Sequence, residues 1–189
     1  MNLRWLPNAI CVGRILLVPP IAFALSTGRY ELTLALFASA AVSDVVDGWL
    51  AKTFGWQSEL GKALDPVADK LLLVTVFLTL AAIGLAPAWL AAAAVIRDVV
   101  IAGGATVYHR LFGRLDGGPS AISKLNTALQ VSFVVVVIAN AAWRGVPDGL
   151  VIALGAATFV TTVVSGLDYV LRYSRMALAN RRARPHGAA

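Results

Sequence analysis

Six long apolar runs, separated by short polar breaks, follow one another along the chain. Each run is about 20 residues long, which is the length that an α-helix needs to cross the hydrocarbon core of a bilayer. The breaks contain glycine, proline or charged residues, which favour turns. The pattern therefore predicts an all-α membrane protein with six transmembrane helices, at residues 9–26, 31–51, 66–86, 88–112, 121–142 and 149–172.

Composition supports this prediction, because 59% of the residues are hydrophobic and only 14% are charged, against about a quarter charged in soluble domains. The length of 189 residues leads us to expect one six-helix transmembrane domain at residues 1–175 and a basic, disordered cytoplasmic tail at 176–189. The first run resembles a signal peptide, but Arg14 and the Pro19–Pro20 pair interrupt it. We therefore interpret it as a retained first helix. The single Cys11 is expected to be a buried apolar side chain.

The basic residues between the runs gather on one side of the predicted membrane topology. Because cytoplasmic loops are enriched in lysine and arginine, this asymmetry predicts that both termini are cytoplasmic. The lack of a presequence leads us to expect a bacterial inner membrane. The net charge of +6 then suits an anionic membrane surface rather than nucleic acid. One side receives only Arg29 and Arg144, and the other receives Arg4, Lys52, Lys62, Arg110, Arg114, Lys124, Arg172, Arg175, Arg181, Arg182 and Arg184.

Four aspartates flank the break between the second and third runs. Asp44 and Asp47 are three residues apart, and Asp65 and Asp69 are four apart, so each pair lies on one face of its helix. The two helices are antiparallel neighbours, which would bring all four carboxylates together near the cytoplasmic interface. The alternative is an ordinary polar loop whose acids pair with its lysines. Glu59 matches no such spacing and is expected to be a solvated loop residue.

Carboxylates without histidine or cysteine partners favour Mg²⁺, Mn²⁺ or Ca²⁺ over zinc. Mg²⁺ typically connects protein carboxylates to substrate phosphates, so the cluster indicates a phosphoanhydride substrate. Gly48 and Gly61, at either end of the break, have no side chain and would allow the substrate to approach the backbone closely. Positive charge for the phosphates would come from Lys52, Lys62 and Lys70.

The spacing of this stretch resembles the CDP-alcohol phosphatidyltransferase signature, D-x2-D-G-x2-A-R-x8-G-x3-D-x3-D. Every interval matches, and Lys52 replaces the arginine of the family. The first run also resembles the first helix of the family, with Asn8, Arg14 and Pro19 in matching places. The resemblance implies a homodimer of six-helix subunits with a cytoplasmic-side cavity. It implies a site for two metal ions (Mg²⁺ or Mn²⁺) at Asp44, Asp47 and Asp65, with Asp69 chiefly as general base or as a further ligand, and a CDP pocket at Gly48, Ala51, Lys52 and Gly61.

The same resemblance implies CDP-diacylglycerol as donor, CMP as leaving group and an alcohol as acceptor. Arg97 and Asp98 lie within the fourth run, where ionisable residues are usually functional. They are candidates for binding the acceptor, together with Lys124 and Asn126. The alternatives are a structural Arg97–Asp98 ion pair, a helix cap at Ser123 and an interfacial Lys124.

The pairing of the stretches at 96–98 and 122–130 resembles the cardiolipin synthases of the eukaryotic and actinobacterial type, which use phosphatidylglycerol as acceptor. A phosphatidylglycerophosphate synthase, which uses glycerol 3-phosphate, is the alternative within the family. A small cation transporter is the alternative outside it. Transport would favour acids spread through several spans near mid-membrane, whereas these acids cluster at one interface.

Overall fold

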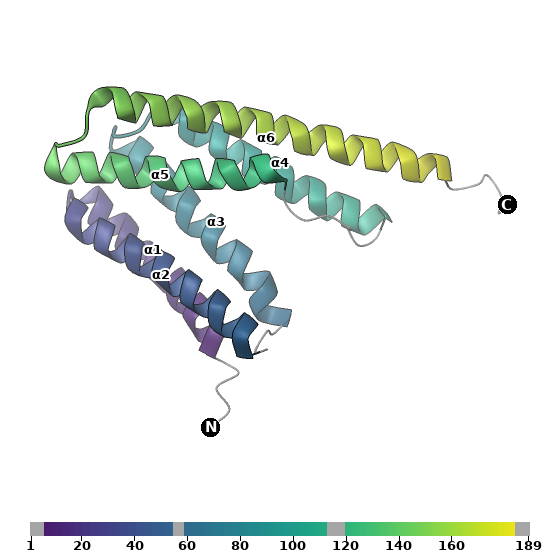
Figure 1. Cartoon of the computed structure of the whole chain (residues 1–189), viewed down its shortest axis with the longest axis horizontal. Coiled ribbons are helices and arrows are strands. Elements are labelled where there is room, and N and C mark those ends of the chain that lie inside the picture. Colours follow the sequence, from purple (N-terminus) through teal and green to yellow (C-terminus); the bar gives the residue numbers. More distant parts are fainter. Residues whose placement is uncertain (1–5, 55–58, 113–119, 184–189) are drawn as a thin grey trace. The chain divides into compact units, whose positions relative to one another are not determined.

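Six α-helices make up the computed structural model of the chain, which describes residues 6–54, 59–112 and 120–183 (Figure 1). Within these ranges, the side chains of 6–9, 45, 47–52, 54, 59–66, 108–112 and 177–183 lie outside the description. The helices are α1 (Leu6–Ser26), α2 (Tyr30–Phe54), α3 (Glu59–Ala82), α4 (Ala88–Phe112), α5 (Ala121–Trp143) and α6 (Asp148–Ala183).

The six helices match the six apolar runs in order, but all except α4 extend beyond the predicted bounds at one end or both, and α3 ends at Ala82 rather than at 86. The α2 helix continues to Phe54 and α3 begins at Glu59, so Glu59 opens a helix and is not a loop residue. The α6 helix continues to Ala183, through residues 176–183 of the segment that we expected to be a disordered tail. Hydropathy locates only the apolar part of each helix. The backbone hydrogen bonds of the helix continue into the polar flanks, which hydropathy does not detect.

The exposed surface of the described helices is unusually apolar. Leu16, Phe23 and Ile152 are 69%, 65% and 70% exposed, which is expected for side chains that face lipid. Within the residues that the structure describes, three helical segments are long and apolar enough to cross a membrane, namely Ala88–Val107, Ala121–Trp143 and Asp148–Met176, and Ile10–Ser26 forms a shorter apolar helix. These helices indicate an integral, multi-pass membrane protein.

The chain forms two compact units. The first comprises residues 1–91 and 134–151, and within it α1 packs against both α2 and α3. Its core includes Ile21 and Leu25 of α1, Phe37 of α2, and Val76 and Leu80 of α3. This packing brings the helices that carry the four aspartates against one common neighbour.

The α1 helix runs without interruption through Pro19 and Pro20. Proline lacks a backbone N–H, but transmembrane helices tolerate it because other groups satisfy the released carbonyls. The helix ends at Ser26, and the positive φ of 74° at Gly28 lets Arg29 N donate to Ala24 O over 2.9 Å, as in a Schellman motif. The first apolar run therefore forms a continuous helix, and the chain turns sharply from it into α2.

The second unit comprises residues 92–133 and 152–189, and so contains most of α4 and α6 with the first half of α5. Its interior is polar. Buried hydroxyl, amide and guanidinium groups lie between these helices beside a few buried apolar side chains such as Ala94 and Phe133. The buried polar residues are Arg97, Ser123, Asn126, Gln130, Thr158, Thr161, Thr162 and Ser165.

Candidate active site

Three helices of the first unit place polar side chains at the ends of their buried stripes. On α1, Arg14 lies in a buried series with Cys11 and Val18 at helical spacing. On α2, Asp44 continues the stripe of Phe37 and Ala40, and on α3 Asp69 precedes the stripe that contains Leu73, Val76 and Leu80. Residues three or four positions apart share one face of a helix, so the apolar packing of these helices directs the three polar groups toward one another.

Arg14 brings the two aspartates together. Its Nη1 atom lies 2.8 Å from Oδ1 of Asp44 and 2.5 Å from Oδ1 of Asp69. The Arg14 side chain is 1% exposed, whereas those of Asp44 and Asp69 are 44% and 50% exposed. Two carboxylates from different helices therefore converge on one cation, with their outer sides open to the surroundings.

The other members of the signature lie partly outside what the structure describes. The helical backbone carries Asp47 one turn after Asp44 on α2, and Asp65 one turn before Asp69 on α3. Their side chains lie outside the description, as do those at the predicted CDP-binding positions Gly48, Ala51, Lys52 and Gly61. The roles of these residues stay predictions.

The convergence of Asp44 and Asp69 fits a divalent metal ion. Their oxygens already surround one positive charge, and hard oxygen donors are the ligands that Mg²⁺ and Mn²⁺ prefer. Among the described side chains, no group of three or more histidines, cysteines, aspartates and glutamates gathers at a metal-binding distance. A complete ligand set would need Asp47 and Asp65, whose side chains lie outside the description.

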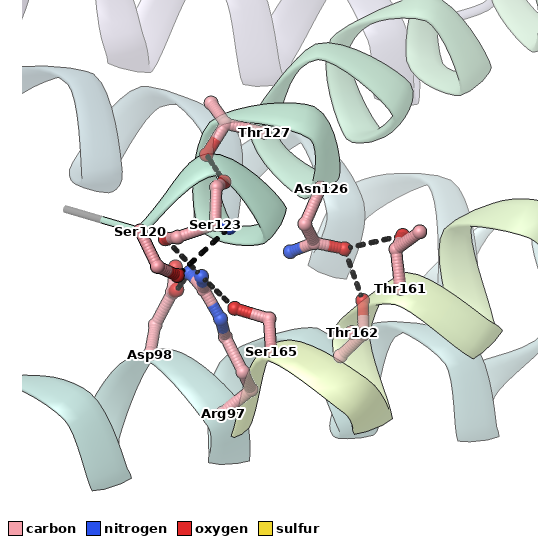
Figure 2. A network of polar contacts seen from close by, with 9 residues as sticks. All are labelled: Arg97, Asp98, Ser120, Ser123, Asn126, Thr127, Thr161, Thr162 and Ser165. Carbon is pink, nitrogen blue, oxygen red and sulfur yellow. Dashed lines mark hydrogen bonds and ion pairs between the residues drawn. The ribbon is translucent and has the colours of Figure 1, made fainter. Parts of the chain in front are cut away.

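In the second unit, Arg97 joins three helices through its guanidinium group (Figure 2). Nη1 contacts Oδ1 of Asp98 at 2.7 Å, and Nη2 donates to Ser123 Oγ at 2.5 Å and to Ser165 Oγ at 2.6 Å. Arg97 is 5% exposed and Asp98 is 12% exposed. The structural ion pair considered from the sequence is thus present, and it belongs to a larger network.

The remaining acceptor candidates, Lys124 and Asn126, differ in their surroundings. Lys124 is exposed, whereas Asn126 is buried and accepts hydrogen bonds from Thr161 and Thr162 at 2.9 and 2.8 Å (Figure 2). The start of α5 is capped by Ser120, whose Oγ accepts from the backbone N–H of Ser123 at 3.3 Å. The cap at Ser123 considered from the sequence is therefore wrong, since its hydroxyl contacts Arg97.

A cavity of about 400 Å³ lies at the other end of α2, lined by Gly28, Arg29, Tyr30, Glu31, Leu32 and Ala142. At a rise of about 1.5 Å per residue, Glu31 is about 20 Å along α2 from Asp44. Its carboxylate accepts a 3.1 Å hydrogen bond from Trp143 Nε1. The cavity is therefore a separate feature, and the carboxylate pair is the better candidate for the chemistry.

The sequence did not indicate several residues of the carboxylate site and of the Arg97 network. The sequence shows Arg14 as a charge within an apolar run and as a match to the first helix of the family, but it gives Arg14 no place in the carboxylate site, although an ionisable residue inside a span is itself a signal that an acidic partner exists. Ser165 and Thr162 gave no signal, because hydroxyl residues are common in membrane helices and readily bond their own backbone. The partners of Arg97 depend on helix packing, which spacing along one helix does not reveal.

Comparison with known proteins identifies the family. The family model for CDP-alcohol phosphatidyltransferases matches residues 4–167, which include the whole carboxylate signature. A probable cardiolipin synthase (CMP-forming) of Drosophila melanogaster is 29% identical over 186 residues, covering 90% of this chain and 58% of the relative. The rat cardiolipin synthase (CMP-forming) is 28% identical over 180 residues, covering 87% and 60%.

A CDP-diacylglycerol–glycerol-3-phosphate 3-phosphatidyltransferase of Bacillus subtilis is 31% identical over 185 residues, which cover 87% of this chain and 92% of the relative. The chain thus spans only about three fifths of the two cardiolipin synthases, at 58% and 60%, but nearly all of the bacterial relative. The match of a family model over most of its length shows that the chain belongs to the CDP-alcohol phosphatidyltransferase family.

Proposed function

We propose that this membrane protein transfers a phosphatidyl group from CDP-diacylglycerol to the hydroxyl group of an acceptor, with release of CMP. The proposal is supported chiefly by the convergence of Asp44 and Asp69 on one cation. These residues are the first and last aspartates of the family signature, and they come from two different helices. A site with converging carboxylates on one side and lipid-facing helices around it suits a donor with a diphosphate and two acyl chains.

The reaction is a displacement at the phosphorus atom that bears the lipid. The acceptor oxygen forms a bond to this phosphorus, and the bond from phosphorus to the bridging oxygen of CMP breaks, with CMP retaining the electron pair. We assign the acceptor's proton to the Asp69 carboxylate, which would act as general base. Most of the catalysis in such transfers comes from position and charge. The main task of the site is therefore to hold the donor in place and to stabilise its negative charge.

Metal dependence is general in this family, and we assign the ions to Asp44, Asp47, Asp65 and Asp69. Two Mg²⁺ or Mn²⁺ ions at these carboxylates would supply positive charge to the diphosphate and to the departing CMP. We assign the cytidine nucleotide to a pocket formed by Gly48, Ala51, Lys52 and Gly61. Lys52 keeps the positive charge of the family arginine but offers a single ammonium group in place of a planar fork.

Phosphatidylglycerol is the acceptor that we favour, which would make the protein a cardiolipin synthase. Similarity to the cardiolipin synthases of fly and rat over 90% and 87% of this chain supports it. Arg97, Asp98, Lys124 and Asn126 remain the candidates for acceptor binding. Glycerol 3-phosphate is the second candidate, because the Bacillus subtilis relative has a similar identity of 31% and is covered over 92% of its length.

We further propose the membrane arrangement that the sequence predicts. All six helices would span the membrane as a single domain at residues 1–175, with both termini in the cytoplasm and the bacterial inner membrane as the location. The excess of basic residues on the side of the termini supports this orientation. The functional unit would be a homodimer, as the family resemblance implies.

The full-length protein, purified in detergent micelles, tests the proposal with labelled CDP-diacylglycerol and Mn²⁺ or Mg²⁺. Phosphatidylglycerol and glycerol 3-phosphate are offered in parallel, and CMP release and the lipid product are measured. We expect CMP release with cardiolipin as product; phosphatidylglycerophosphate would select the second acceptor instead. Failure to release CMP with either acceptor would contradict the transferase, and metal-ion flux into protein-containing vesicles would then favour a cation transporter.

A further inference from the structure

Arg14 is buried to a degree that is unusual for a charged side chain. It is 1% exposed and lies between the buried Cys11 and Val18 on the packed face of α1. A guanidinium group in such surroundings is costly unless it is paired with anions and hydrogen-bonded. Its two carboxylate partners meet this requirement, so the position of Arg14 is linked to the carboxylates rather than to helix packing alone.

The three side chains form two layers. The guanidinium of Arg14 lies on the core side, whereas Asp44 and Asp69 remain 44% and 50% exposed. An ion or a phosphate that approaches from the surroundings therefore meets the carboxylates first. Arg14 lies beneath them and has no exposed route to a substrate.

The contacts of Arg14 constrain both carboxylates at once. Because a single nitrogen contacts one oxygen of each, at 2.8 and 2.5 Å, the two Oδ1 atoms are held close together. Each carboxylate also stays 44% or 50% exposed, so it is not enclosed by its contact with Arg14. This is the arrangement of an outer group that orients ligands, and removal of such groups from metal sites typically costs about 10- to 100-fold in metal affinity.

We propose that Arg14 is the positioning residue of the carboxylate site. It holds Asp44 and Asp69 in the orientation in which they bind a divalent metal ion, and it touches neither the lipid substrate nor the reacting atoms. This inference rests on the metal site of the proposed function. The opposite role, a cation that competes with the metal for the same oxygens, predicts the opposite change in affinity when Arg14 is removed.

Binding of Mn²⁺ to the purified full-length protein, without any lipid substrate, separates these roles. Unbound Mn²⁺ is measured by electron paramagnetic resonance in titrations of the wild type, Arg14→Gln, Arg14→Lys and Arg29→Gln. Arg29 is an exposed arginine in the turn after α1, so Arg29→Gln is a matched control. We expect the dissociation constant to rise about 10-fold or more in Arg14→Gln, to rise less in Arg14→Lys, which keeps the charge, and to stay unchanged in Arg29→Gln.

Thermal unfolding without metal shows which variants are folded. A folded Arg14→Gln that binds Mn²⁺ as tightly as the wild type, or more tightly, would overturn the proposal. If Arg14→Gln does not fold, Arg14→Lys provides the same comparison. Failure of both to fold would also overturn it, because Arg14 would then be a residue of helix packing.

The two proposals fail in different ways. A wild type that binds Mn²⁺ but releases no CMP contradicts the proposed function alone. A folded Arg14 variant with wild-type affinity contradicts the positioning role alone. A wild type that binds no Mn²⁺ contradicts both.

Discussion

Nη2 of Arg97 on α4 donates a 2.6 Å hydrogen bond to Oγ of Ser165 on α6, and both groups are buried. The same nitrogen also contacts Ser123 on α5, so one guanidinium connects all three helices of the second unit. Asp98 provides the neighbouring negative charge. We expect this network to set the stability of the unit, whatever further role Arg97 has with the acceptor.

Replacement of Ser165 by alanine should destabilise the protein. The change removes an acceptor from a buried cation, and a hydrogen bond to a charged group contributes about 1.5–3 kcal/mol. The free energy of unfolding in detergent should fall by about this amount. Ser132→Ala is the control, because Ser132 is exposed and bonds only a carbonyl of its own helix at 2.8 Å, and it should change stability by less than about 0.5 kcal/mol. Equal stability of the two variants would show that the bond from Arg97 to Ser165 contributes nothing to stability.

Replacement of Asp69 by asparagine should abolish turnover while the protein stays folded. Asparagine has nearly the same shape as aspartate but cannot accept the acceptor's proton, and the loss of a general base costs about 10²- to 10⁴-fold in rate. CMP release from CDP-diacylglycerol is the measurement. Asp148→Asn is the control, since Asp148 is an exposed residue of the first turn of α6. Wild-type turnover by Asp69→Asn would exclude the base role.

Removal of divalent ions should stop the reaction reversibly. Excess EDTA should abolish CMP release, and an excess of Mg²⁺ or Mn²⁺ should restore it, because the donor set consists of carboxylates. Zn²⁺ should restore less, since the cluster has no histidine or cysteine. Undiminished CMP release in EDTA would contradict the metal site.

Two glycine-to-alanine changes should have opposite effects on stability. A Cβ atom added at Gly155 of α6 would lie 3.2 Å from Cε2 of Phe133 on α5, whereas nothing lies within 4 Å of one added at Gly103 of α4. Gly155→Ala should lower the free energy of unfolding by about 1 kcal/mol through overpacking. Gly103→Ala should raise it by up to about 1 kcal/mol, because glycine is unfavourable inside helices. Thermal unfolding of both variants tests the contrast.

Local sequence patterns predict the helices and the helix faces that carry the carboxylate pair. The apolar runs gave six helices in the correct order, and the spacing of the aspartates placed Asp44 and Asp69 on helices that pack against a common neighbour. The end of α2 at Phe54 and the start of α3 at Glu59 were harder to predict. Hydropathy locates the part of a helix that lies in lipid, and the polar flanks carry no such signal.

Contacts between distant segments could not be predicted from the same patterns. The convergence of Arg14 with two carboxylates depends on how α1 lies against α2 and α3. The bonds of Arg97 to Ser123 and Ser165 depend on the packing of three helices, and serine gives no distinctive pattern in an apolar sequence. The sequence suggests a cap at Ser123, whereas the cap is Ser120, one turn earlier. Several hydroxyl residues lie near the start of α5, and the sequence does not distinguish among them.

The two buried arginines differ in when their acidic partners are synthesised. Arg97 has its counter-ion, Asp98, as the very next residue, so the α4 segment can leave the translocon as a nearly neutral unit before α5 and α6 exist. The carboxylates that contact Arg14 belong to α2 and α3, which emerge from the ribosome later than α1. Since an arginine at mid-helix costs about 2.5–3.5 kcal/mol on insertion scales, the first helix should become more stable in the bilayer once its acidic neighbours are present, and assembly of the proposed catalytic centre would be coupled to biogenesis.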